Sequence, residues 1–137
     1  MLPALMSFAL LSAQPVAGGE RPRVTRAEAQ QLVMAALTPA QRRLPSAQAG
    51  FSGGDDVFRS ERFVGLTAIW DGPKNGSVVI GVYDVDPYTG DVFSATAECV
   101  EFENPGLIKL QRKIRTRLML SDAQYKRLKT KGELCDT

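Results

Sequence analysis

The chain contains no histidine, and this absence removes the most common general base from any catalytic scheme. A Ser-His-Asp triad or a Cys-His pair needs an imidazole beside the nucleophile, so neither can be assembled. The acidic pairs Asp55/Asp56 and Asp84/Asp86 remain as acid–base candidates. They fall in a glycine-rich loop and at a turn, where aspartate is usually solvated or caps the turn. We therefore predict no catalytic residues and no enzymatic activity.

Motifs for metals and phosphates are also missing. The two cysteines, Cys99 and Cys135, do not have the spacing of a zinc site. The acidic turn at 84–91 lacks the third alternating ligand and the distal glutamate of a calcium loop. The glycine-rich stretch 45–60 has no Gly-Lys-Ser/Thr step, so we interpret it as a connection and not as a phosphate-binding loop. The sequence predicts no metal and no cofactor.

The chain has no hydrophobic run long enough to span a bilayer as a helix. Residues 1–19 carry a short apolar run followed by small residues, which is typical of a secretory signal peptide, although no Lys or Arg precedes the run. An N-terminal core helix is the alternative, and Pro3 disfavours it. We predict export to the periplasm or the extracellular space. In that setting Cys99 and Cys135 would form one disulfide, worth about 3–4 kcal/mol over a loop of about 36 residues; two buried or free thiols are the alternative.

The composition is that of an ordinary globular protein, but charge is unevenly distributed. With 137 residues, 44% hydrophobic and 23% charged, the chain fits one domain with a modest core. Residues 45–103 carry three basic and ten acidic side chains, whereas residues 104–137 carry nine basic and three acidic ones. This asymmetry indicates either a surface for a partner or internal complementarity between the basic end and the acidic middle.

The N-terminal half predicts helices and then a sheet. Thr25 and Glu28 form a capping-box pattern before a helix over about 26–37, and a short helical turn follows from Pro39 to about Arg43. Three strands are expected, at 62–71, 77–86 and 92–102. Short connections at 72–76 and 87–90 make them an antiparallel meander. In the central strand, period-two alternation places Val79, Tyr83 and Val85 on one face.

The C-terminal segment predicts a pair of basic helices. Leu107, Ile114 and Leu118 recur at helical spacing, and Ser121 with Gln124 forms a second capping box. A strand over 113–120 is the alternative for the first helix. The expected fold class is therefore α+β, an N-terminal helix on a three-stranded antiparallel meander sheet followed by a basic helix pair. We expect one domain over 22–137, in which a helix-and-sheet part (22–103) precedes a basic helical tail (104–137) tied by the disulfide.

Two short patterns resemble those of the PepSY domain family. One is Val-Thr-Arg-Ala-Glu-Ala at 24–29, and the other is the strand-turn-strand at 82–92, with the resemblance covering about 22–95. The basic tail and the cysteines lie outside it. The resemblance implies a small exported α+β module, similar to a cystatin in placing a helix against an antiparallel sheet. It also implies binding or inhibition of a partner such as a peptidase in the cell envelope, and it carries over no catalytic residues.

These observations favour a non-catalytic exported module that binds another protein, as a monomer or weak oligomer. The alternatives are an immunity-type protein that neutralises a periplasmic toxin, and an envelope structural protein held to anionic membrane by its basic helices. Nucleic acid is disfavoured because only Tyr125 interleaves with the basic residues of the tail. The candidate binding residues are exposed aromatic and polar positions on the sheet and its hairpin tips, and cations on the first tail helix: Trp70, Asn75, Tyr83, Tyr88, Arg112, Lys113, Arg115 and Arg117.

Overall fold

The computed structural model describes residues 21–52, 63–73, 77–95 and 100–129, and it has the expected α+β architecture. The leader at 1–19, Asn75, Cys99 and Cys135 lie outside these ranges, so export and the disulfide stay predictions. The elements in chain order are α1 (Arg26–Ala36), α2 (Pro39–Arg42), β1 (Gln48–Phe51), β2 (Val64–Asp71), β3 (Ser77–Val85), β4 (Val92–Ser94), α3 (Pro105–Arg117) and α4 (Asp122–Leu128).

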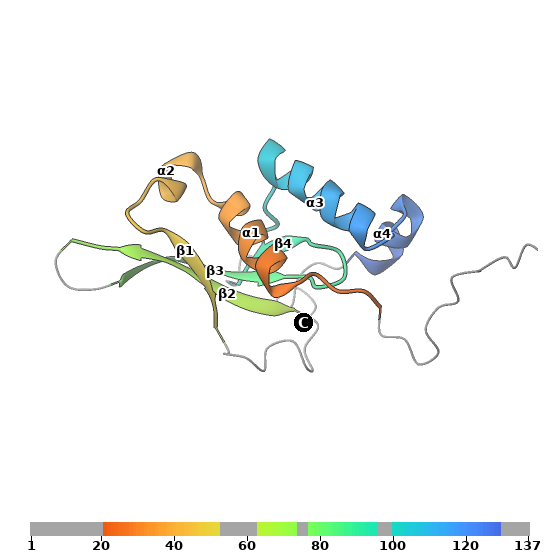
Figure 1. Cartoon of the computed structure of the whole chain (residues 1–137), viewed down its shortest axis with the longest axis horizontal. Helices are drawn as coiled ribbons and strands as arrows, with labels where there is room; N and C mark the ends of the chain where they lie inside the picture. Colours follow the sequence, from red (N-terminus) through yellow and green to blue (C-terminus); the bar gives the residue numbers. More distant parts are fainter. Residues whose placement is uncertain (1–20, 53–62, 74–76, 96–99, 130–137) are drawn as a thin grey trace, which may run out of the picture.

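The four strands form one antiparallel sheet in the order β1-β2-β3-β4, and the helices gather on one side of it (Figure 1). Helix α1 lies across the sheet and α3 packs beside α1. The core between these layers is aliphatic and includes Leu32, Leu66, Val85, Leu107 and Ile114, each almost fully buried. Burial of these side chains is the main stabilising contribution to such a fold.

Strand β1 corrects the interpretation of 45–60 as a connection. Gln48–Phe51 pairs with β2 over four residues, and Gln30 in α1 donates a side-chain hydrogen bond to the carbonyl of Ala49 at 3.0 Å. Only Ala49 is buried in this strand. Because its pairing is made by backbone groups, a short edge strand of this kind leaves almost no hydrophobic pattern in the sequence.

A β-bulge corrects the predicted face of the central strand. The pairing of β3 with β2 skips Ile80. The extra residue shifts the alternation by one, so side chains before Ile80 point to the opposite face of the sheet from the one that strict alternation predicts. Val79 is therefore 58% exposed, whereas Tyr83 and Val85 are buried. Strict alternation from Val79 to Val85 predicts a single face for all three residues and is wrong for Val79.

The expected third strand at 92–102 is also wrong in its length. Strand β4 ends at Ser94, and residues beyond the undescribed 96–99 return alongside it. The Ser94 amide donates to the carbonyl of Val100 at 2.8 Å, and the Phe102 amide donates to the carbonyl of Val92 at 2.9 Å. The segment thus consists of the short strand β4 and a second stretch, at 100–102, that is hydrogen-bonded beside it. This second stretch leads into α3.

The helix start signals are confirmed. The two predicted capping boxes form, with reciprocal bonds between Thr25 and Glu28 and between Ser121 and Gln124, and a third joins Thr38 and Gln41 at the start of α2. The strand alternative over 113–120 is wrong, because α3 continues to Arg117 and is followed by a turn.

Candidate functional site

The turn between β3 and β4 is buried beneath the C-terminal helices. Gly90 has φ +76°, as the turn requires, and a carboxylate oxygen of Asp86 accepts the amide of Tyr88 at 2.9 Å. Asp86, Thr89 and Asp91 are each at most 1% exposed. The turn-capping role expected for Asp86 is confirmed, while solvation of its carboxylate is wrong; Asp55 and Asp56 lie outside the described ranges.

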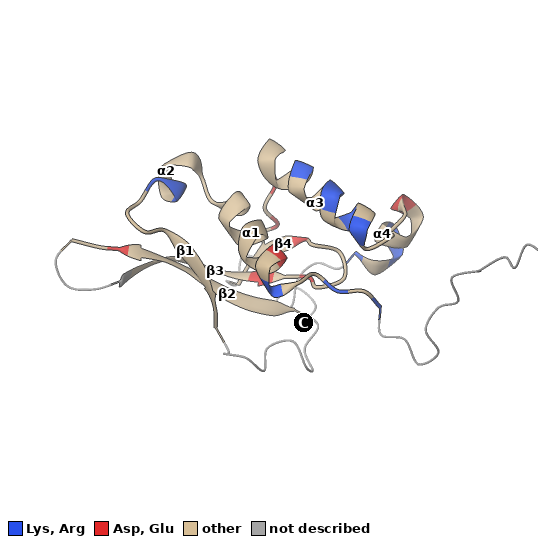
Figure 2. Ribbon diagram, viewed as in Figure 1, with Lys and Arg blue, Asp and Glu red and all other residues tan. Residues whose placement is uncertain are grey.

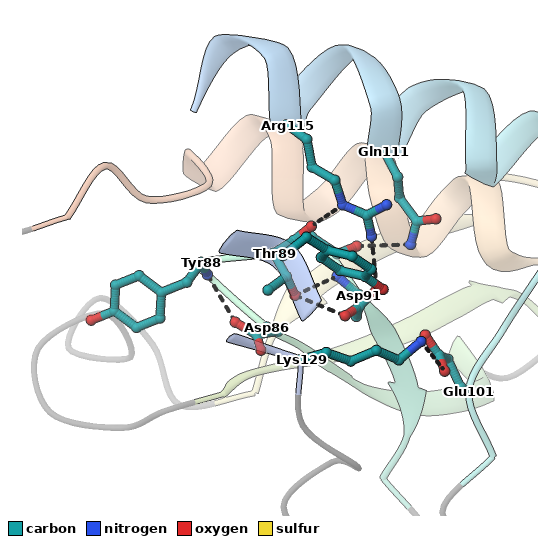
Figure 3. A network of polar contacts seen from close by, with 10 residues as sticks. Asp86, Tyr88, Thr89, Asp91, Glu101, Gln111, Arg115 and Lys129 are labelled. Atoms are coloured by element: carbon teal, nitrogen blue, oxygen red, sulfur yellow. Dashed lines mark hydrogen bonds and ion pairs between the residues drawn. The ribbon is translucent and has the colours of Figure 1, made fainter. Parts of the chain in front are cut away.

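Asp91 is the centre of a polar cluster that joins this turn to α3 and α4 (Figure 3). Its Oδ1 accepts hydrogen bonds from Arg115 Nη2 and from the Tyr125 hydroxyl, both at 2.8 Å, and its Oδ2 accepts from Thr89 Oγ1 at 2.9 Å. Arg115 Nε also donates to the Thr89 carbonyl at 2.9 Å, and Gln111 donates to the carbonyl of the turn glycine at 3.0 Å. Both carboxylate oxygens are satisfied, which is the arrangement of a structural junction.

Two further ion pairs tie the basic end of the chain to earlier segments. Arg117 bonds both carboxylate oxygens of Glu28 in α1 and donates to the Arg23 carbonyl. The hydrogen bond from Arg117 lowers the pKa of Glu28 below its ordinary value. Lys129 lies 3.4 Å from Glu101, whose pKa is raised mainly by burial. The Arg115–Asp91 and Lys129–Glu101 pairs join the basic end to the acidic middle, which confirms the predicted internal complementarity, whereas Arg117 pairs outside the acidic middle, with Glu28 of α1.

The structure divides the four predicted cations of α3 into two pairs. Arg115 is half-buried and pairs with Asp91, and Arg117 pairs with Glu28 at the surface. Arg112 and Lys113 are exposed, as is Lys109, and no ion pair is formed by these three among the described residues. We call Lys109, Arg112 and Lys113 the α3 cationic face; Lys109 lies about one helical turn before the adjacent pair Arg112 and Lys113, opposite the buried side of α3. Figure 2 shows the Lys and Arg positions of α3 in blue, following one another along the helix.

Helical periodicity in the sequence contains the signal for this division. Taking Leu107, Ile114 and Leu118 as the buried stripe, positions 109, 112 and 113 fall on the opposite side of a helix, whereas 115 and 117 fall on its flanks. Lys109 belongs to the same exposed group as Arg112 and Lys113 and is missing from the residues predicted above.

The predicted aromatic residues do not form one surface. Trp70 is half-buried at the hairpin end of β2, whereas Tyr88 is half-buried in the turn at the opposite end of β3. Tyr83 is 4% exposed and its ring packs on Phe102 with centroids 5.3 Å apart, so its assignment to an exposed sheet face is wrong. Asn75 lies outside the described ranges.

The described residues offer neither a membrane span nor a metal-binding cluster. No helix in that part of the chain is long and apolar enough to cross a membrane. No three histidine, cysteine, aspartate or glutamate side chains within the same ranges are grouped so that they could hold a metal ion.

Comparison with known proteins gives a likeness in fold. The chain is similar to one in a solved structure described as "Structure of a type VI secretion system effector-immunity complex from Pseudomonas protegens", with a TM-score of 0.54 and 23% sequence identity. The match covers 85% of this chain and 94% of that chain. No family model and no curated protein matches the sequence, so the PepSY resemblance stays a prediction. At this identity, the likeness establishes the shared fold.

Proposed function

We propose that this chain is a non-catalytic binding protein of the immunity type, which neutralises a toxin in the cell envelope by binding to it. The observation that carries the proposal is the fold shared, over 85% of this chain and 94% of the other, with a chain in a type VI effector–immunity complex. The PepSY resemblance implies inhibition of an envelope peptidase instead. That function would use the same physical action, because the chain would block the surface of the peptidase in place of that of a toxin.

The chemistry of this chain supports the immunity side of such a complex over the effector side. The chain has no histidine, and its buried Asp91 carboxylate is occupied by Arg115, Tyr125 and Thr89. Side chains committed to joining elements of the fold are poor candidates for transferring protons to a substrate. A protein that acts by occlusion needs only a stable scaffold and a surface.

The α3 cationic face supplies that surface. Lys109, Arg112 and Lys113 project three positive charges from about one and a half turns of a rigid helix. Because Arg115 and Arg117 on the flanks of the helix are paired with Asp91 and Glu28, the unpaired positive charge of α3 lies on this face. The field of this charge steers an acidic partner toward the helix and raises the association rate. We therefore propose that the partner presents an acidic surface.

Affinity capture from an envelope extract, followed by a toxicity assay, tests the proposal. Wild-type chain should retain one protein that stops growth when expressed alone and is harmless when this chain is co-expressed. Charge reversal with Arg112→Glu and Lys113→Glu should weaken the complex at least ten-fold and restore toxicity. The matched control, Arg42→Glu with Arg43→Glu, makes the same charge change on exposed residues of the α2 region and should leave protection intact.

Two results would contradict the proposal. One is a retained partner whose toxicity persists in the presence of wild-type chain. The other is a chain that retains no envelope protein but floats with anionic vesicles in a salt-dependent manner, which would favour the structural, membrane-bound alternative. That alternative has fewer charges to use than the sequence indicates, because Arg115 and Arg117 are engaged within the fold.

A further inference from the structure

A groove of about 370 Å³ lies where the N-terminal lead, the β3–β4 turn and the α3–α4 junction meet. Its apolar lining includes Leu118, Leu120 and Leu128. Arg21 and Arg127, both exposed, also line it, and no acidic side chain does so among the described residues. The groove begins at the C-terminal end of α3, the same helix that carries the cationic face.

Met119, which also lines this groove, combines two unusual properties. Its φ is +55°, in the left-handed region that disfavours any side chain with a Cβ atom, and 83% of the residue is exposed. The backbone requires this conformation, because the Met119 amide donates to the Thr116 carbonyl at 3.0 Å and the Leu120 amide donates to the Arg115 carbonyl at 2.9 Å. This helix ending usually places glycine at the left-handed position. A large apolar side chain there is strained and exposed at once.

We propose that this groove, with Met119 at its edge, receives an apolar side chain of the partner protein that is flanked by carboxylates. The identification of the occupant as part of a toxin rests on the proposed function; the ligand chemistry rests on the groove alone. The leucine floor suits the apolar group, and Arg21 and Arg127 suit the carboxylates beside it. Methionine is enriched at interfaces and its flexible thioether adapts to an incoming side chain. Backbone strain that persists at an exposed residue is a feature of binding sites.

Synthetic peptides and methionine-methyl NMR test this assignment. The probe has one phenylalanine between two pairs of glutamates, and its counterpart has lysines in place of the glutamates. With ¹³C-methyl methionine in the chain, the glutamate probe should shift the Met119 resonance and leave that of the half-buried Met34 in place. The lysine probe should bind at least ten-fold more weakly, and Arg127→Glu should weaken the glutamate probe by a similar factor.

Met119→Gly separates binding from folding. Because glycine relieves the left-handed strain, the variant should unfold at an equal or higher urea concentration than wild type, while fluorescence anisotropy with a labelled glutamate probe shows at least ten-fold weaker binding. Arg43→Glu, at an exposed site outside the groove, should bind the probe as wild type does.

Three outcomes would overturn the inference: no Met119 shift with the glutamate probe at about 1 mM, equal shifts with both probes, or a Met119 shift that depends on protein concentration without any probe. The last would assign the groove to a second copy of this chain. If the probe binds as expected but no envelope toxin is neutralised, the proposed function fails and the groove's ligand chemistry stands. If neutralisation survives Met119→Gly and Arg127→Glu, the proposed function stands without the groove.

Discussion

Replacing Arg115 with methionine is expected to destabilise the fold far more than any charge change on the outer side of α3. The substitution keeps most of the apolar stem but removes the guanidinium from Asp91, which is 1% exposed. Leaving a buried charge without its partner costs about 3–5 kcal/mol. Asp91 keeps the hydroxyls of Tyr125 and Thr89, so we expect the lower end of this range, about 3 kcal/mol.

The reciprocal change should be milder. Asp91→Asn leaves Arg115, whose side chain is 19% exposed, and this cation can turn toward water. A loss of about 1–2 kcal/mol is expected, typical of weakened hydrogen bonds. The double variant removes both charges together, so its loss of stability should be smaller than the sum of the two single losses.

Urea unfolding measures these differences. Far-ultraviolet circular dichroism and the fluorescence of Trp70, the chain's single tryptophan, provide two independent probes. Arg112→Met is the matched control, because it makes the same substitution one turn away on an exposed residue and should change stability by less than about 0.5 kcal/mol. If Arg115→Met and Arg112→Met unfold within about 0.5 kcal/mol of each other, the Asp91 cluster does not join the elements as described.

Two further predictions concern an ion pair and a turn. Arg117 lowers the pKa of Glu28, so the pair's stabilisation is present above the unfolded value of 4.5 and is lost as the pH falls through the folded value. Arg117→Ala should therefore destabilise by at most about 1 kcal/mol at pH 7, and a deficit in urea midpoint that persists undiminished at about pH 2 would contradict this linkage. Gly90→Ala should cost about 1–2 kcal/mol in thermal unfolding, because φ is +76° while the added Cβ meets Leu32 only at an ordinary 3.7 Å. Gly50→Ala, with no neighbour within 4 Å, should cost nothing, and equal losses at both glycines would refute the argument.

Features with local causes could be predicted from the sequence. A helix start is set by residues three apart, so Thr25 with Glu28 and Ser121 with Gln124 identify α1 and α4 directly. A turn that needs a positive φ similarly reveals itself through Gly90. In these places a few neighbouring residues decide the conformation, and tertiary contacts reinforce it.

Features with distant causes could not be predicted. Strand β1 exists because β2 offers it backbone partners, and the bulge at Ile80 exchanges the faces of β3 without altering the composition of the strand. The candidate site depends on such distant causes too. A count of charges in the sequence does not distinguish Arg112 from Arg115. Of these two, only Arg115 contacts a buried carboxylate, that of Asp91, which belongs to a turn 24 residues earlier in the chain.

The seating of the β3–β4 turn under α3 has a consequence for synthesis on the ribosome. Arg117 donates to the Arg23 carbonyl across 94 residues, and the amide of Val24 donates to the Pro87 carbonyl at 2.7 Å. In a nascent chain that has not yet reached Pro105, Asp91 therefore lacks both Arg115 and Tyr125 as partners. Folding is completed only when α3 emerges, so we expect nascent chains lacking α3 to remain susceptible to proteases and chaperones.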